Sequence, residues 1–213
     1  MAIKVKEIYP AIIGEGRYSG YCGLLVRVAG CNLRCGYCDT RYAWRGGRNY
    51  QRKDLIERVK KSGYQRVLIT GGEPLLQEEM IEFLKELVHA GKKVLLETNG
   101  SISIKKVPKK VHIIMDLKSP DSGEETANDY QNLKWLKSTD ELKLVLVSHK
   151  DYQWAKRLLK QKRFSSRCHI NFSSAFGFLK PAQLARWIIK DRLNVRLNLQ
   201  WHRLIFPGKA RGV

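Results

Sequence analysis

The stretch AGCNLRCGYCDTRY, residues 29–42, places three of the five cysteines of this chain within eight residues. They are Cys31, Cys35 and Cys38, in the spacing C-x3-C-x2-C. A short loop with these gaps can turn three thiolates toward one centre, and thiolates favour zinc or an iron–sulfur cluster. The loop therefore predicts a metal centre, and the identity of its fourth ligand decides which kind.

No fourth ligand lies nearby in the sequence. A closed zinc site takes four protein ligands, but Cys22 belongs to another segment and His89 falls in a predicted helix. A 4Fe–4S cluster held by three cysteines leaves one iron without a protein ligand, and that iron can bind a substrate or a cofactor. A zinc site completed by Cys168 or a distant histidine, and a chance grouping of cysteines, remain as alternatives.

Length and composition indicate an ordinary globular protein. With 213 residues, of which 43% are hydrophobic, the chain can bury one core, and we expect a single domain over residues 1–213. No apolar run approaches the roughly 20 residues that cross a bilayer, and the start MAIKVKEIYPAIIGEG does not resemble a signal peptide. We therefore expect a cytoplasmic protein whose clustered cysteines bind metal rather than form disulfides.

The charge is strongly positive. Forty Lys and Arg residues against 20 Asp and Glu residues give a net charge of +20. The basic residues are spread over nearly every predicted helix, and no zinc-finger or RNA-module signature accompanies them. We expect a solvated basic surface, with attraction of a small anionic substrate as an alternative, and a nucleic-acid role is disfavoured.

Short apolar segments alternate with amphipathic ones along the chain. The apolar segments predict strands over 4–10, 23–30, 66–72, 93–100, 111–120, 141–149, 168–174 and 196–202. The amphipathic segments predict helices over 53–63, 78–91, 128–138, 151–163 and 180–191. Strands joined by helices favour a parallel sheet covered by helices, as an open doubly wound sheet or as a full or partial barrel.

The residues able to do chemistry follow the predicted strands directly. GCNLRC, TGGEP, TNG, KSP, SSAFG and QWHR each stand at the carboxyl end of a strand. Parallel barrels and open α/β sheets place their active sites at this end. One shared site at the carboxyl face is the simplest prediction.

Two motifs carry a resemblance to a known superfamily. The cysteine loop, with Tyr37 as the aromatic residue before Cys38, resembles the cluster motif of radical S-adenosylmethionine (SAM) enzymes, and ITGGEP resembles their SAM-binding segment. This resemblance implies a partial TIM-like barrel with a cluster-binding loop at the carboxyl face of the strands. It also implies a 4Fe–4S cluster whose open iron binds SAM, and reductive cleavage of SAM to a 5′-deoxyadenosyl radical.

A narrower resemblance covers nearly the whole chain. GEGRYSGYCGLLVRVAGCNLRCGYCDTRYA, TGGEPLLQ, ETNG, DLKSPDSGE, ELKLVLVSHKDYQWA and LQWHRLIF resemble, in this order, the 7-carboxy-7-deazaguanine synthase family. The implied reaction converts 6-carboxy-5,6,7,8-tetrahydropterin to 7-carboxy-7-deazaguanine by hydrogen abstraction at carbon 6, ring contraction and loss of ammonia. It belongs to the pathway of queuosine- or archaeosine-type tRNA nucleosides. Magnesium, an external electron donor and a homodimer are also implied.

The resemblance gives roles to cofactor-binding residues. It implies that Cys31, Cys35 and Cys38 hold the cluster and that Thr40 offers a hard oxygen ligand to Mg²⁺. Two glycines in TGGEP would let the backbone approach SAM, and Glu73 could accept a hydrogen bond from its ammonium group. The residues implied for SAM are Tyr37, Asp39, Gly71, Gly72, Glu73, Pro74, Glu97, Lys118, Ser119, Pro120, Ser173 and Ser174.

A second set is implied for the substrate. The Arg27 guanidinium suits the substrate carboxylate, and Glu15 can accept hydrogen bonds from pterin nitrogens. A surface arginine and a polar turn residue are the alternatives at these positions. The complete set is Ile12, Ile13, Gly14, Glu15, Arg27, Thr70, Thr98, Asn99 and His202. Two residues depart from the family pattern: Ile13 replaces a common glutamine, and Ser174 replaces a proline.

Other classes of protein share some of these features. An activating enzyme that places a glycyl radical on a partner protein would share the cysteine loop and GGEP, but it would not need Arg27 and the GEG segment. A basic, metal-containing nucleic-acid binder would need neither GGEP nor polar residues at strand ends. Both remain as alternatives from the sequence.

Overall fold

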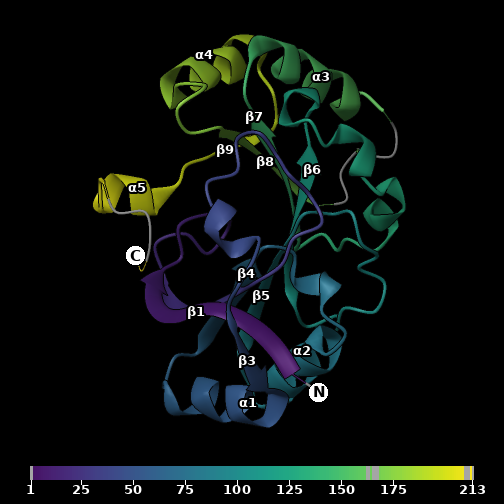
Figure 1. Ribbon diagram of the computed structural model, residues 1–213. Helices are drawn as coiled ribbons and strands as arrows, with labels where there is room; N and C mark the ends of the chain where they lie inside the picture. The colour runs from purple at the N-terminus through teal and green to yellow at the C-terminus, as the bar shows by residue number, and fades with distance from the viewer. Residues whose placement is uncertain (1, 162–163, 165–167, 209–211, 213) are drawn as a thin grey trace.

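The computed structural model describes residues 2–161, 164, 168–208 and 212, and its main feature is one curved sheet (Figure 1). The strands are β1 (Ala2–Ile12), β2 (Cys22–Val28), β3 (Arg48–Gln51), β4 (Arg66–Gly71), β5 (Lys93–Thr98), β6 (His112–Lys118), β7 (Glu141–Leu146), β8 (His169–Ser174) and β9 (Arg196–Asn198). The helices are α1 (Arg52–Lys61), α2 (Met80–His89), α3 (His149–Leu159), α4 (Pro181–Asp191) and α5 (Trp201–Ile205). Short 3-10 helices include η1 (Arg41–Ala43), η2 (Pro74–Leu76) and η5 (Tyr130–Lys134).

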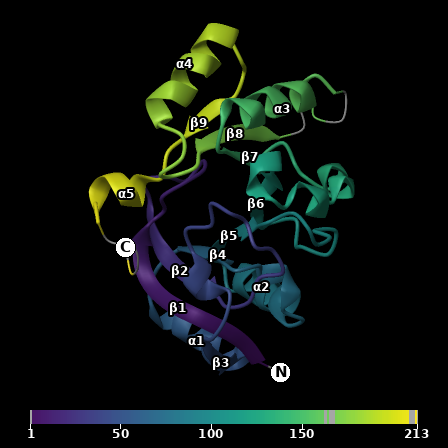
Figure 2. The ribbon, with the colours of Figure 1, turned by 45° about the horizontal axis from the view of Figure 1, so that its top comes forward.

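The nine strands lie in the order β3-β1-β2-β4-β5-β6-β7-β8-β9. Each neighbouring pair in the run β2-β4-β5-β6-β7-β8-β9 is parallel. Strand β1 is antiparallel to both β2 and β3. Since β3 and β9 stand at opposite edges of this order, the sheet is curved but not closed (Figure 2). The α/β class and the partial barrel predicted above are confirmed.

Alternation along each strand divides the side chains between two faces. Outward-facing residues such as Val26, Ile69 and Leu96 join the main apolar core, together with the buried sides of α1 to α4. Inward-facing Leu25, Leu68, Leu95 and Ile114 form a smaller apolar cluster with Ile13. This inner cluster fills the middle of the barrel, so that inward-facing residues further along each strand form the floor of a cavity.

Most predicted elements form. Two predicted elements differ from the structure, and one strand in the structure was not predicted. The helix expected over 128–138 is wrong: only η5 and turns form there, because the side chain of Asn132 donates to the carbonyls of Gly100 and Ile102 and accepts from Ile104 N–H, which ties the segment to the preceding loop. The strand expected over 196–202 ends at Asn198, and α5 follows it. The polar edge strand β3 was not predicted.

Some boundaries also move. The helix expected over 151–163 forms as α3, which begins at His149 and ends at Leu159, and residues 162–163 of that prediction lie outside the described residues. Within the described part of the chain, no helix combines the length and the apolar character that a membrane span requires.

Candidate active site

A cavity of about 250 Å³ opens at the carboxyl ends of the parallel strands. Its wall includes residues from β1, from the cysteine loop, from β2 and β4 to β8, and from the segment that ends in α5. The predicted residues that line it are Ile12, Gly14, Glu15, Arg27, Cys31, Cys35, Tyr37, Cys38, Asp39, Thr40, Thr70, Gly71, Gly72, Glu97, Thr98, Asn99, Lys118, Ser173, Ser174 and His202. The fold therefore brings most of the predicted residues to one place.

The cysteine loop forms one side of the cavity. All five cysteines of the chain are free, and Cys31, Cys35 and Cys38 line the cavity together. Neighbouring segments hold the loop: Gly36 N–H donates to the Ser122 carbonyl at 3.0 Å, and Arg34 N–H donates to the Glu124 carboxylate at 2.5 Å. These contacts tie the loop to the segment that follows β6.

Three free thiols that line one cavity are a donor set that suits an iron–sulfur cluster. Across the described residues, no three His, Cys, Asp or Glu side chains converge on one point as they would around a single metal ion. A 4Fe–4S cluster does not require such convergence, because each cysteine binds a different iron. Burial raises the pKa of the Cys35 thiol to about 11, and Lys118 opposes this rise. A bound cationic centre would stabilise the thiolate instead.

The TGGEP loop packs directly on the cysteine loop. A Cβ atom on Gly72 would lie 1.8 Å from the Gly30 carbonyl oxygen, and one on Gly71, whose φ is +134°, would lie 2.3 Å from the Val28 oxygen. Glu73 N–H donates to the same Gly30 carbonyl at 2.7 Å. Both glycines are therefore required for this contact between two backbones, in addition to lining the cavity.

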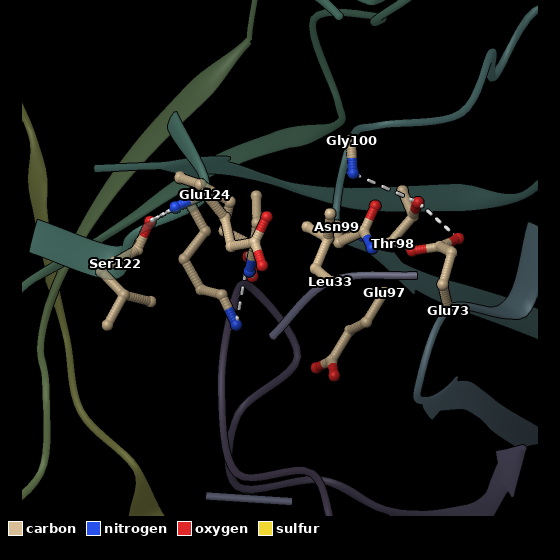
Figure 3. A network of polar contacts seen from close by, with 12 residues as sticks. Leu33, Glu73, Glu97, Thr98, Asn99, Gly100, Ser122 and Glu124 are labelled. Carbon is tan, nitrogen blue, oxygen red and sulfur yellow. Dashed lines mark hydrogen bonds and ion pairs between the residues drawn. The ribbon is translucent and has the colours of Figure 1, made fainter. Parts of the chain in front are cut away.

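Glu73 lies behind the cavity wall. Its fully buried carboxylate accepts hydrogen bonds from Leu75 N–H at 2.9 Å, from Thr98 Oγ1 at 2.8 Å and from Asn99 N–H at 2.6 Å (Figure 3). Burial raises the pKa of Glu73, and the two backbone bonds oppose that rise. The carboxylate joins the TGGEP loop to the end of β5, and Thr70, Gly71 and Gly72 are the residues of this motif that line the cavity.

Four further predicted residues do not line the cavity. Ser119 is buried, and its hydroxyl donates to Asp151 at 2.8 Å and contacts the Val145 carbonyl at 3.0 Å. Ile13 belongs to the inner apolar cluster beneath the cavity. The others are Pro74 and Pro120.

The floor of the cavity is a network of buried ionic side chains. Lys143 Nζ lies 2.8 Å from a Glu15 oxygen and 3.4 Å from an Asp116 oxygen, and Lys118 Nζ lies 2.7 Å from the other Asp116 oxygen. Glu97 accepts a hydrogen bond from Thr70 Oγ1 at 2.6 Å, and its pKa is raised by burial although Lys143 opposes the rise.

Arg27 stands at the edge of this floor with partners of its own. Its Nε atom lies 2.5 Å from the Glu7 carboxylate, which also accepts a hydrogen bond from Tyr42 OH at 2.6 Å. Its Nη2 atom lies 3.4 Å from Tyr9 OH. These contacts fix the orientation of the Arg27 guanidinium. A carboxylate that bound to Arg27 would have to share the guanidinium with Glu7.

The segment leading into α5 covers the other side of the cavity. Trp201 N–H donates to the Gly14 carbonyl at 3.0 Å, and a Cβ atom on Gly14 would lie 2.9 Å from His202 Nδ1. Burial lowers the pKa of His202, which favours the neutral imidazole. Gln200 Nε2 donates to Glu15 at 3.1 Å and to Asp39 at 3.0 Å. This amide thus bridges the GEG segment and the cysteine loop.

Several lining residues were not predicted. They include Tyr42, Trp44, Asp116, Lys143, Gln200 and Arg203. A signal for two of them exists in the sequence: Asp116 in IIMDLK and Lys143 in ELKLVL are charged residues inside apolar strands, where an unpaired charge would be costly. The others carry no comparable signal.

Comparisons with known proteins show which family and fold this chain shares. The family model for the radical SAM superfamily matches residues 25–143. The chain is 37% identical to a 7-carboxy-7-deazaguanine synthase of Koribacter versatilis, over 99% of this chain and 100% of that protein. It is 38% identical to one of Chlorobaculum tepidum, over 99% of this chain and 97% of that protein. At the level of fold, the crystal structure of QueE from Escherichia coli matches with a TM-score of 0.77 at 20% identity, covering 95% of both chains.

Proposed function

The chain belongs to the 7-carboxy-7-deazaguanine synthases of the radical SAM superfamily, and we propose that it converts 6-carboxy-5,6,7,8-tetrahydropterin to 7-carboxy-7-deazaguanine with loss of ammonia. One observation carries the proposal: a single cavity brings the cysteine loop together with Glu15, Arg27 and His202. Family membership over nearly the full length also sets aside the activating enzyme and the nucleic-acid binder.

The chain's own residues divide the work within the cavity. Cys31, Cys35 and Cys38 would hold a 4Fe–4S cluster, and Gly71 and Gly72 would lie against SAM. When bound, these two groups supply the radical that removes a hydrogen atom from carbon 6 of the substrate. The protein must then fix one substrate hydrogen in reach and exclude water.

Two ends of the cavity suit two ends of the substrate. Arg27 would bind the carboxylate through its guanidinium, which Glu7 and Tyr9 already orient. Glu15 would accept hydrogen bonds from the N–H groups of the pyrimidine ring. His202, neutral because burial lowers its pKa, adds a polar group on the side formed by α5.

We further propose that Mg²⁺ binds beside the substrate carboxylate through Thr40. The Thr40 hydroxyl now donates to Asp39 at 2.8 Å, so it lies in the cavity with a carboxylate neighbour. Replacing Thr40 with Val removes this oxygen at constant shape, and we expect the Mg²⁺ concentration for half-maximal activity to rise about tenfold. Titration of Mg²⁺ in the activity assay measures this. Thr139→Val, at an exposed site, is the control, and an unchanged Mg²⁺ requirement in Thr40→Val would contradict the role.

Further proposals concern the setting of the enzyme. The single sheet that runs from β3 to β9 supports one radical SAM domain over residues 1–213. Five free cysteines support action in the reducing cytoplasm. The chemistry needs an external electron donor, and exposed Trp201, Leu204 and Ile205 on α5 support a homodimer.

One anaerobic experiment tests the reaction. Reconstituted protein is incubated with SAM, a chemical reductant, Mg²⁺ and 6-carboxy-5,6,7,8-tetrahydropterin, and the products are measured by mass spectrometry. We expect 7-carboxy-7-deazaguanine to form only when all components are present. Accumulation of 5′-deoxyadenosine without a deazaguanine product would show that the assigned substrate is wrong.

A further inference from the structure

Lys143 is a buried cation at the centre of the cavity floor. It points inward from the middle of β7, opposite Asp116 in the parallel register of β6 and β7, and only 9% of it is exposed. Its Nζ atom lies 2.8 Å from Glu15 Oε2 and 3.4 Å from Asp116 Oδ1. A lysine this deeply buried requires anionic partners, and both of them also line the cavity.

The charges on the floor show which partner depends on Lys143. Asp116 has a second and closer cation, because Lys118 Nζ lies 2.7 Å from its Oδ2 atom. Glu97 is held by the Thr70 hydroxyl, and burial raises its pKa, which favours its neutral form. Glu15 has Lys143 as its ion-pair partner within the described residues. Lys143 is therefore the counter-ion of Glu15.

The orientation of Glu15 is fixed by three donors. Oε2 accepts from Lys143 and, at 3.3 Å, from Asn198 Nδ2, whereas Oε1 accepts from Gln200 Nε2 at 3.1 Å. A carboxylate offers about four lone-pair sites, so about one acceptor site remains free, on Oε1. These donors come from β7, from β9 and from the residue before α5, and together they hold the carboxylate in one rotamer.

We propose that Lys143 is a positioning residue that sets the affinity for the substrate, because it holds the Glu15 carboxylate in place and directs its remaining acceptor toward an N–H donor of the pyrimidine ring. This inference rests on the proposed function. The inference gives Lys143 no contact with the cluster or with SAM. Removal of the lysine side chain should therefore affect substrate binding and leave SAM binding unchanged. The predicted consequence is that loss of Lys143 lowers substrate affinity only when Glu15 is present.

A double-mutant cycle tests this dependence. The variants are Lys143→Met, Glu15→Gln and the double variant, and we expect each single substitution to raise KM for the carboxytetrahydropterin about 10-fold or more. The double variant should have nearly the KM of Glu15→Gln alone, because the lysine has nothing left to position. KM for SAM should stay within about twofold of wild type in all variants.

Lys137→Met is the matched control. Lys137 also pairs with a buried aspartate, since its Nζ atom lies 2.7 Å from Asp140 and 3.0 Å from the Val111 carbonyl, but it does not line the cavity. We expect wild-type KM values for this variant. A rise in substrate KM equal to that of Lys143→Met would mean that loss of any lysine paired with a buried aspartate disturbs the site, and it would overturn the inference.

The remaining outcomes separate the two proposals. If Lys143→Met does not fold, Glu15→Gln is compared with the double variant instead. The double variant loses one positive and one negative charge, so it leaves no unpaired charge from this ion pair. Equal KM values support the inference, and a further large rise in the double variant overturns it. If the wild-type enzyme makes no deazaguanine product, the proposed function is wrong; if it does and the two effects on KM multiply, only the role of Lys143 is wrong.

Discussion

Cys35 is the buried member of the three cavity cysteines, with 7% of the residue exposed. Because burial raises its pKa to about 11, the free thiol is protonated at neutral pH. Binding of iron must therefore release a proton and replace the hydrogen with a positive centre, which stabilises the buried thiolate. Loading of a cluster at Cys35 is thus expected to be coupled to proton release.

Replacing Cys35 with Ala should abolish stable cluster binding and activity. Two cysteines cannot hold a 4Fe–4S cluster against loss to solvent, and the smaller side chain adds no alternative ligand. Iron and sulfide analysis after anaerobic reconstitution, together with the visible absorption of the cluster, measures the effect. Cys22→Ala, at an exposed position on β2, is the control and should keep its iron. Full activity in Cys35→Ala would refute the assignment of the loop.

The common location of residues at the ends of strands was predictable, whereas the pairing of charged residues within strands was not. Cys31, Thr70 and Asn99 stand beside glycines and turn residues that mark where a strand ends, so their common location follows from a parallel sheet. Lys143 and Asp116 lie within apolar strands, and only the register of β6 with β7 shows that they meet. Pairing between distant strands is a property of the folded sheet that local sequence does not contain.

Two loops at the carboxyl ends of neighbouring strands contact one another through their backbones. The TGGEP loop after β4 and the cysteine loop after β2 approach so closely that Gly72 has no room for a side chain. Since β2 and β4 are hydrogen-bonded neighbours, their loops start side by side. This contact therefore sets how the cysteine loop and the TGGEP loop lie relative to one another.

Gly72→Ala should disturb both loops at once. A Cβ atom 1.8 Å from the Gly30 oxygen forces the backbones apart, and we expect the free energy of unfolding to fall by about 2–3 kcal/mol. Urea denaturation measures this loss, and calorimetric titration measures the accompanying loss of SAM affinity. Gly36→Ala is the control, because its Cβ atom would lie 3.9 Å from the nearest atom, in ordinary contact. Equal stability of the two variants would contradict the steric argument.

At the level of elements, the sequence predicts the parallel strands well and the irregular segments poorly. Strands β4 to β7 are rich in Val, Ile and Leu and are bounded by polar turns, which is typical of strands buried on both faces. The segment 128–138 has helical spacing, yet Asn132 uses its side chain to bind a distant loop. Tertiary hydrogen bonds override local preference there.

The molecule as a whole is tied together beneath the barrel by Glu141. This fully buried carboxylate accepts hydrogen bonds from Arg17 N–H at 2.7 Å, from His112 at 2.7 Å and from Asn171 at 2.6 Å, and it pairs with Arg196. Burial alone would raise the pKa of Glu141, but these bonds lower it to about 2. One side chain thus joins segments from both ends of the sheet.

The apoprotein should therefore lose stability in acid through Glu141. Its folded pKa of about 2 lies below the ordinary value of 4.5, so its contribution is complete above about pH 4.5 and is lost as the pH falls toward 2. The shift corresponds to roughly 3 kcal/mol. Urea unfolding at a series of pH values measures this slope. Glu141→Gln should be less stable at pH 7 and show a smaller loss in acid, and a slope equal to that of the wild type in this variant would contradict the role of Glu141.

The contacts that complete the cavity join distant parts of the chain. Gly16 N–H donates to Asn198 Oδ1 at 2.8 Å across 182 positions, and Trp201 N–H binds the Gly14 carbonyl. The three cysteines, by contrast, lie within eight residues of one another. During synthesis on the ribosome, the cysteine loop leaves the exit tunnel long before Asn198 does. A growing chain therefore displays its three proposed iron ligands at a stage when the proposed pterin pocket is still incomplete.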